Sequence, residues 1–136
     1  MENFDGKIAV ITGGGTGMGR ELTYQLAAEG CHVSICDVIE ENMEETFQEA
    51  TKKYPHVKIT KHLCDVSSEE DVLRFRDEVL EQQKTEHINL LFNNAGIGGG
   101  ASFVLSGIEE WERTFKICWD GVYLCSRAFM LSLIHI

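Results

Sequence analysis

A cluster of glycines near the amino terminus is the feature that most constrains how this chain of 136 residues can fold. The cluster reads TGGGTGMG at residues 12–19 and follows the short apolar run Lys7–Thr12. Such a run suits a buried parallel strand, and Met18, Leu22 and Leu26 then recur at helical spacing. A strand, a glycine loop and a helix in this order present free backbone N–H groups and a positive dipole end to an anion.

The spacing of the glycines distinguishes between the known phosphate-binding loops. The loop lacks Gly-x-Gly-x-x-Gly, and Gly19 is followed by Arg20 instead of the Lys-Ser/Thr of a Walker A loop. The spacing that is present is Thr-Gly-x-x-x-Gly-x-Gly, at Thr12, Gly13, Gly17 and Gly19. An ordinary glycine turn is the alternative interpretation of the cluster taken alone.

The rest of the chain alternates strands and helices. Strands are predicted at His32–Asp37, Val57–Cys64 and Ile88–Asn93, and helices at Glu40–Tyr54, after the capping signals Ser67 and Ser68, and from about Glu109 to about Met130, with a glycine-rich loop at Gly96–Gly100. This rhythm implies an α/β fold with a parallel sheet and right-handed crossovers. We expect a partial doubly wound Rossmann fold of strand order 3-2-1-4, with the C-terminal strands missing, in one incomplete domain over residues 1–136.

The long predicted helix carries an apolar stripe. Its members are Trp111, Phe115, Cys118, Val122, Cys125 and Phe129. We expect this stripe to pack on the sheet or on another subunit.

Asp37 ends the second predicted strand. A carboxylate there can accept hydrogen bonds from the ribose hydroxyls of an adenosine, and it would repel a 2′-phosphate. No Arg or Lys lies between Gly13 and Gly19 to bind such a phosphate. The sequence therefore predicts a preference for NAD over NADP; a helix N-cap or turn role for Asp37 is the alternative.

In this order the motifs resemble the N-terminal half of the short-chain dehydrogenase/reductase family. Asp65-Val66 resembles the family's adenine-contacting pair, and residues 93–96 match its Asn-Asn-Ala-Gly motif. The resemblance implies that Asn94 and the backbone after it line the nicotinamide ribose, whereas Asn93 is more structural. The cofactor-binding residues expected for NAD are Gly13, Thr16, Gly17, Met18, Gly19, Asp37, Asp65, Val66, Asn94, Ala95 and Gly96.

The resemblance also implies a function, the transfer of a hydride between a nicotinamide and an alcohol or ketone. The family's Ser and Tyr-x-x-x-Lys lie in its second half, so no catalytic residue is assigned here, and this fragment alone is expected to be inactive. Tyr54 and Lys58 have the right spacing, but Pro55 breaks the helix that such a pair needs. A non-catalytic NAD-binding or subunit-interaction module is the alternative.

Two features depart from the family pattern. Cys118 stands where the family usually has an Asn that supports a proton-relay water, and a thiol is a poor substitute for an amide. The last residues, Leu131–Ile136, contain no turn before the chain ends. We expect a truncated reading frame or a scar there, and a real but abruptly ended strand is the alternative.

Charge and composition argue against several functional classes. The formal net charge is −10, which disfavours nucleic acid and anionic membranes as partners. No uninterrupted apolar run approaches the ~20 residues of a membrane span, and no signal peptide is recognised. The five cysteines form no metal-binding pattern. We expect no metal, a cytoplasmic location, and a full-length parent that is a homodimer or homotetramer acting on a small alcohol or carbonyl substrate.

Overall fold

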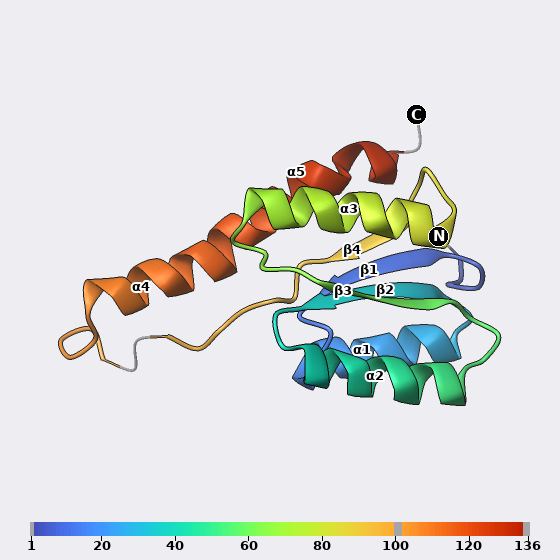
Figure 1. Ribbon diagram of the computed structural model, residues 1–136, viewed down its shortest axis with the longest axis horizontal. Helices are drawn as coiled ribbons and strands as arrows, with labels where there is room; N and C mark the ends of the chain where they lie inside the picture. The colour runs from blue at the N-terminus through green and yellow to red at the C-terminus, as the bar shows by residue number, and fades with distance from the viewer. Residues whose placement is uncertain (1, 100–101, 135–136) are drawn as a thin grey trace.

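The computed structural model describes residues 2–99 and 102–134 and has a parallel β-sheet with helices on both faces (Figure 1). The elements in chain order are β1 (Ile8–Thr12), α1 (Gly17–Ala28), β2 (His32–Asp37), α2 (Glu40–Lys53), β3 (Ile59–Leu63), α3 (Glu69–Gln83), β4 (Leu90–Phe92), α4 (Ile108–Phe115), a π-helical turn (Lys116–Asp120) and α5 (Gly121–Ile134). The strand order is β3-β2-β1-β4 and every pair is parallel. The predicted fold class and strand order are confirmed.

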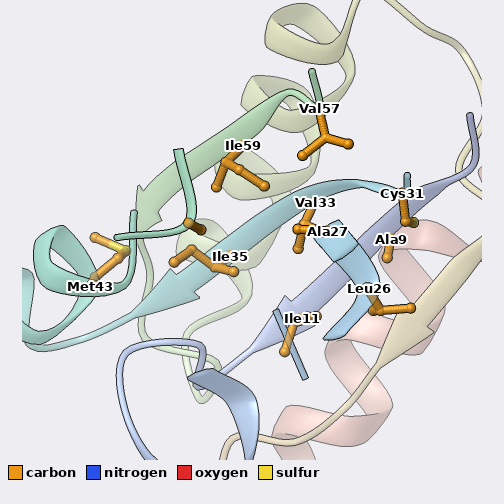
Figure 2. Packing of buried hydrophobic residues seen from close by; sticks show 11 residues of the cluster. Ala9, Ile11, Leu26, Ala27, Cys31, Val33, Ile35, Met43, Val57 and Ile59 are labelled. Carbon is orange, nitrogen blue, oxygen red and sulfur yellow. The ribbon is translucent and has the colours of Figure 1, made fainter. Parts of the chain in front are cut away.

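Alternation along the strands divides the core into two layers. From β1, Ala9 and Ile11 face α1 and α2, while Val10 faces α3 and α5. Figure 2 shows the first layer, in which Val33 of β2 lies beside Ala27 of α1. Because helices cover both faces, most of the buried strand residues are apolar on both sides, as is usual for a parallel sheet.

The ends of the elements follow local signals in the sequence. Gly30, just after α1, has a φ of 82°, α2 ends before Pro55, and the Ser68 side chain caps α3 by accepting a hydrogen bond from the Asp71 N–H at 3.3 Å. The third and fourth strands are shorter than predicted. In β4 this has a visible cause, because the Asn89 side chain accepts the Ile8 N–H at 2.9 Å in place of a backbone carbonyl.

The predicted stripe of the long helix divides into a buried half and an exposed half. Cys125 and Phe129 are fully buried against the sheet and α3, whereas the earlier members are exposed: Trp111, Phe115, Cys118 and Val122. The reason is that α4 projects past the carboxyl ends of the strands, where there is no sheet to cover it (Figure 1). The π-helical turn Lys116–Asp120 also shifts the helical phase between the two halves.

The end of the chain differs from one expectation. Leu131 to Ile134 belong to α5, so the alternative of an abruptly ended strand is wrong. His135 and Ile136 lie outside the described residues, as does Gly100 of the predicted glycine-rich loop.

The long helix meets a criterion for membrane spans that the sequence analysis did not apply. The helix Ile108–Ile134 is 27 residues long and contains an 18-residue window whose mean hydropathy of 1.3 is high enough to cross a membrane. A search for uninterrupted apolar runs misses this helix because Asp120 and Arg127 interrupt it. One such helix is weak evidence for a membrane, since core helices of soluble proteins meet the same criteria.

A chain of buried polar side chains joins the sheet to α3. His62 contacts Glu78 Oε2 through Nδ1 at 2.9 Å and Thr60 Oγ1 through Nε2 at 2.8 Å. Thr60 contacts Ser34 Oγ at 2.6 Å, and Gln83 donates to the same Ser34 oxygen at 3.0 Å. Burial lowers the pKa of His62 more than Glu78 raises it. The neutral histidine is therefore the form that the folded chain favours.

Substitution His62→Leu should lower the free energy of unfolding by about 1–3 kcal/mol, because buried polar partners lose their hydrogen bonds. The folded pKa of His62 lies below its unfolded value of 6.5. The stability linked to this shift is therefore fully present above that unfolded value and is lost as the pH falls towards the folded pKa. Urea unfolding at about pH 7.5 and about pH 5.5 measures how much the free energy of unfolding falls between these two pH values, and this fall should be smaller in His62→Leu. Exposed His56→Gln is the control; an unchanged pH dependence in His62→Leu would contradict this account.

Candidate functional site

A cavity of ≈ 380 Å³ lies at the carboxyl ends of the four strands. Every residue predicted to contact a cofactor lines it except Gly19: Gly13, Thr16, Gly17, Met18, Asp37, Asp65, Val66, Asn94, Ala95 and Gly96. Because parallel strands bring their carboxyl ends to one edge, residues far apart in the sequence meet here.

The amino end of α1 opens into this cavity. The N-cap residue Thr16 makes no side-chain capping bond, and the first turn, which begins at Gly17, contains no acidic residue. The first N–H groups of a helix have no intrahelical acceptor. Here they have no capping side chain either, so this end of α1 can bind an anion such as a pyrophosphate.

The glycine loop is locked to the end of β4. Thr12 Oγ1 accepts the N–H groups of Asn94 at 3.1 Å and of Ala95 at 3.0 Å. The Asn94 amide donates in return to the carbonyls of Thr12 at 3.0 Å and of Gly13 at 3.1 Å. Gly13 has a φ of 68°, and a Cβ on Gly19 would lie 2.1 Å from the Gly13 carbonyl oxygen. Gly19 therefore supports the loop from behind and does not line the cavity.

Asp37 lies in the cavity wall with its carboxylate oriented by the backbone. Oδ2 accepts the N–H of Gly15 at 2.9 Å. Oδ1 accepts the N–H groups of Val38 at 2.8 Å and Ile39 at 3.2 Å. A carboxylate held by several backbone donors is a preorganised acceptor for hydroxyl groups.

Arg20, the first cation after the glycine loop, is turned away from the cavity. Its guanidinium donates to the Gly15 carbonyl at 2.6 Å, to Glu45 at 2.8 Å and to the Asn42 carbonyl at 3.1 Å. These bonds tie the loop to α2. Since its Nε and Nη2 donors are already engaged and Arg20 does not line the cavity, it is poorly placed to bind a phosphate there.

Asp65 and Val66 form the neighbouring part of the rim. Asp65 Oδ1 accepts the N–H of Ser67 at 2.9 Å and its hydroxyl at 2.7 Å. The Asp65 N–H donates to Asp71 at 3.0 Å, and this bond, helped by Arg74, lowers the pKa of Asp71. Asp65, which follows β3, therefore lies at the same edge of the sheet as Asp37, in a turn held by hydrogen bonds to Ser67 and Asp71.

The family model for short chain dehydrogenases matches residues 7–135. The chain belongs to this family. The human "Epidermal retinol dehydrogenase 2" is 32% identical over 133 residues, which are 98% of this chain and 42% of that protein. A Burkholderia phymatum short chain dehydrogenase/reductase solved in complex with NAD matches with a TM-score of 0.89 and 32% identity, over 99% of this chain and 47% of that one.

A second solved structure carries a different cofactor derivative. The alcohol dehydrogenase of the archaeon Thermococcus sibiricus, complexed with 5-hydroxy-NADP, matches with a TM-score of 0.86 and 28% identity, over 93% of this chain and 52% of that one. The chain thus spans about half the length of the proteins it matches.

The two asparagines of the family motif have separate environments. Asn94 and the next two residues line the cavity. Asn93 instead donates to Ser126 Oγ of α5 at 3.0 Å, and its buried Oδ1 has no hydrogen-bond partner among the described residues. Asn93 therefore joins the end of β4 to α5, which agrees with the structural role expected for it.

Cys118, at the family's usual asparagine position, lies in the π-helical turn. Its thiol donates weakly to the Ile97 carbonyl at 3.6 Å, and a Cβ on Gly96 would lie 3.5 Å from its sulfur. Cys118 therefore faces the loop after β4, next to the cavity, although its weak donor cannot reproduce the hydrogen bonding of an amide.

None of the three tyrosines, all of which are described, lines the cavity. Tyr24 donates a hydrogen bond to Glu49. Burial, and to a smaller extent this hydrogen bond, raises the pKa of Tyr24 to about 12, whereas a proton-transfer group needs a pKa nearer the working pH. Tyr54 follows the last residue of α2, and Lys58 precedes β3 at the far edge of the sheet. Tyr123 is exposed on α5. The described residues also contain no cluster of three metal-ligating side chains.

Sequence reasoning missed several cavity residues. They are Cys36, Val38, Ile39, Cys64, Ile97, Arg113 and Ile117. Most are immediate neighbours of predicted residues at strand ends, and proximity in the sequence could have found them. Arg113 and Ile117 come from the helix that follows a long loop, and no local pattern signals their approach.

Substitution Gly19→Val should weaken dinucleotide binding by at least about tenfold, or 1.4 kcal/mol, because its Cβ collides with the Gly13 carbonyl and distorts the loop. Fluorescence titration with NADH measures the affinity. Gly98→Val is the matched control, because a Cβ on Gly98 meets nothing within 4 Å. Equal affinities in the two variants would refute the assignment of the loop.

Proposed function

We propose that this chain is the cofactor-binding part of an NAD-dependent oxidoreductase that transfers a hydride between the nicotinamide and an alcohol or ketone. The observation that carries the proposal is the convergence on one cavity of an uncapped helix end, a backbone-oriented carboxylate and the Asn94 loop. Bound NAD would supply the hydride acceptor. The family membership and the NAD-bound relative support the same conclusion.

Each part of the cavity is proposed to bind one part of the dinucleotide. The loop Gly13–Gly19 and the α1 amino end bind the pyrophosphate, because N–H groups and the helix dipole favour negative charge there. Asp37 accepts hydrogen bonds from the adenosine ribose. Asp65 and Val66 contact the adenine, and residues 94–96 line the nicotinamide ribose.

NAD is proposed over NADP on electrostatic grounds. The Asp37 carboxylate would lie next to a 2′-phosphate and repel it, and the guanidinium of Arg20 is engaged with α2. Relatives with either cofactor are known, so the preference is a property of these particular side chains.

The chain should bind NADH at least about tenfold more tightly than NADPH, a difference of about 1.4 kcal/mol. Asp37→Ala should narrow this ratio, because it removes both the ribose acceptor and the repelling charge. Competitive titration of both cofactors gives the ratio. Asp77→Ala, an exposed carboxylate on α3, is the control for lost charge alone. Tighter binding of NADPH to the unmodified chain would reject the NAD assignment.

As a separate polypeptide, the chain is proposed to bind NAD without turning over an alcohol. The support is that no tyrosine among the described residues lines the cavity, so the proton-transfer step has no group of the family's kind. A binding or subunit-interaction module is thus the second candidate for this polypeptide. We further propose a cytoplasmic location, since all five cysteines are free thiols.

The parent is proposed to be a homo-oligomer that uses α4. Trp111 and Phe115 of α4 and Trp119 of the π-helical turn stack in a row, with ring centroids 5.3 and 5.8 Å apart, and Tyr123 of α5 follows four residues later. The rings are exposed, Trp119 by 66%. An exposed aromatic row of this length is typical of a surface that another subunit covers.

On size-exclusion chromatography the chain should elute as an associated species, and Trp119→Lys should shift it towards the monomer. Leu73→Lys, a partly exposed apolar residue on α3, is the control. An NAD reduction assay with a panel of alcohols should show no turnover in any sample. A monomeric chain that oxidises an alcohol would contradict both the association and the inactivity.

A further inference from the structure

A cysteine directly precedes each of the two carboxylates on the cavity rim. Cys36 comes before Asp37 at the end of β2, and Cys64 comes before Asp65 after β3. The two strands are parallel neighbours with Asp37 opposite Leu63, and the Cys64 N–H donates to the Asp37 carbonyl at 3.1 Å. Both cysteines line the cavity and belong to the same core layer. The fold thus places two thiols side by side in the wall of the cavity.

The two thiols are neighbours, and the other cysteines are arranged differently. The neighbouring Cys64 thiol, together with burial, raises the pKa of Cys36 well above its ordinary value. Cys125 of α5 is the third buried thiol of this layer. Cys31 lies in the opposite layer, where its thiol donates to a backbone carbonyl at 3.3 Å, and Cys118 is exposed. Only Cys36 and Cys64 therefore combine close pairing with a place in the cavity wall.

We propose that Cys36 and Cys64 form a dithiol modification site that a hydroperoxide oxidises to an intramolecular disulfide when the cavity holds no dinucleotide. When the cavity wall opens, one thiol loses its proton and its thiolate attacks hydrogen peroxide as the hydroperoxide. The S–O bond forms, the O–O bond breaks, the sulfur becomes a sulfenic acid, and the released hydroxide takes the proton and leaves as the first water. The second thiol attacks that sulfur, the S–S bond forms, and the second water leaves. The two thiols lose two hydrogens, and the peroxide is reduced to water.

The disulfide would alter the cavity. A disulfide requires Cβ atoms about 3.5–4.5 Å apart, whereas diagonal neighbours on adjacent strands lie farther from each other. Bond formation therefore draws the ends of β2 and β3 together and displaces Asp37 and Asp65, which follow the cysteines directly. The side chains are 0% and 1% exposed, so oxidation needs the cavity wall to open, and a molecule that fills the cavity slows it.

Hydrogen peroxide treatment of the full chain in a Cys118→Ser background, with and without saturating NAD⁺, tests the proposal. Remaining thiols are alkylated in denaturant and the peptides are mapped by mass spectrometry. The expected product joins Cys36 to Cys64 and forms at least about tenfold more slowly with NAD⁺. Adding Cys31→Ser should leave the link intact, whereas adding Cys36→Ser should abolish it. Circular dichroism checks that each variant is folded, and Cys64→Ala repeats the test at the other thiol.

The two arms of the experiment separate this proposal from the proposed function. The protection by NAD⁺ rests on the proposed function, whereas the link itself does not. A folded chain in which Cys36 and Cys64 oxidise without joining, or join Cys125 instead, overturns the dithiol site. A Cys36–Cys64 link that forms equally fast with and without NAD⁺ supports the paired thiols and overturns the cofactor protection.

Discussion

The hydrogen bonds between Thr12 and Asn94 are the interaction on which the candidate site depends. They join the end of β1 to the end of β4, two segments about 80 residues apart in the sequence. Asn94 donates from its backbone and its side-chain amide, and Thr12 accepts with its hydroxyl and its carbonyl, so the loss of either side chain leaves backbone groups of the other segment without partners. The glycine loop keeps its shape only while this connection holds, because the Asn94 amide also donates to the Gly13 carbonyl.

Around this connection, each element contributes a different group to the candidate site. The helix α1 supplies uncapped N–H groups, β2 and β3 supply carboxylates held by backbone donors, and the loop after β4 closes the remaining side. The polar chain from Ser34 to Glu78 anchors α3 over β2 and β3. Buried polar groups of this kind stabilise a structure only when each is satisfied.

The two halves of the carboxyl-terminal helix have different surroundings. Its second half, with Cys125 and Phe129, is a core element, while its first half presents stacked aromatic rings to solvent. The change occurs at the π-helical turn, where Ile117 and Cys118 approach the cavity. The long helix thus contributes to the core, to the candidate site and to an exposed surface.

The sequence by itself determined the order of the strands, the helix ends at Gly30, Pro55 and Ser68, and ten of the seventeen residues that line the cavity. These features depend on local backbone preferences and on the rule that parallel strands end at one edge, and both can be read from short segments. Gly19 was predicted to contact the cofactor, but it lies behind the loop against Gly13, a position that could not be read from spacing.

Only the tertiary structure decided what each side chain of the long helix faces, where the thiols meet, and which way Arg20 points. A helical stripe shows that residues share a face, but it does not show whether another element covers that face. Trp111 and Phe129 both belong to the predicted stripe, but Trp111 is exposed and Phe129 is buried in the fold. The closeness of the Cys36 and Cys64 thiols likewise depends on the register of β2 and β3. That register is set by the packing of the whole sheet and by no single segment.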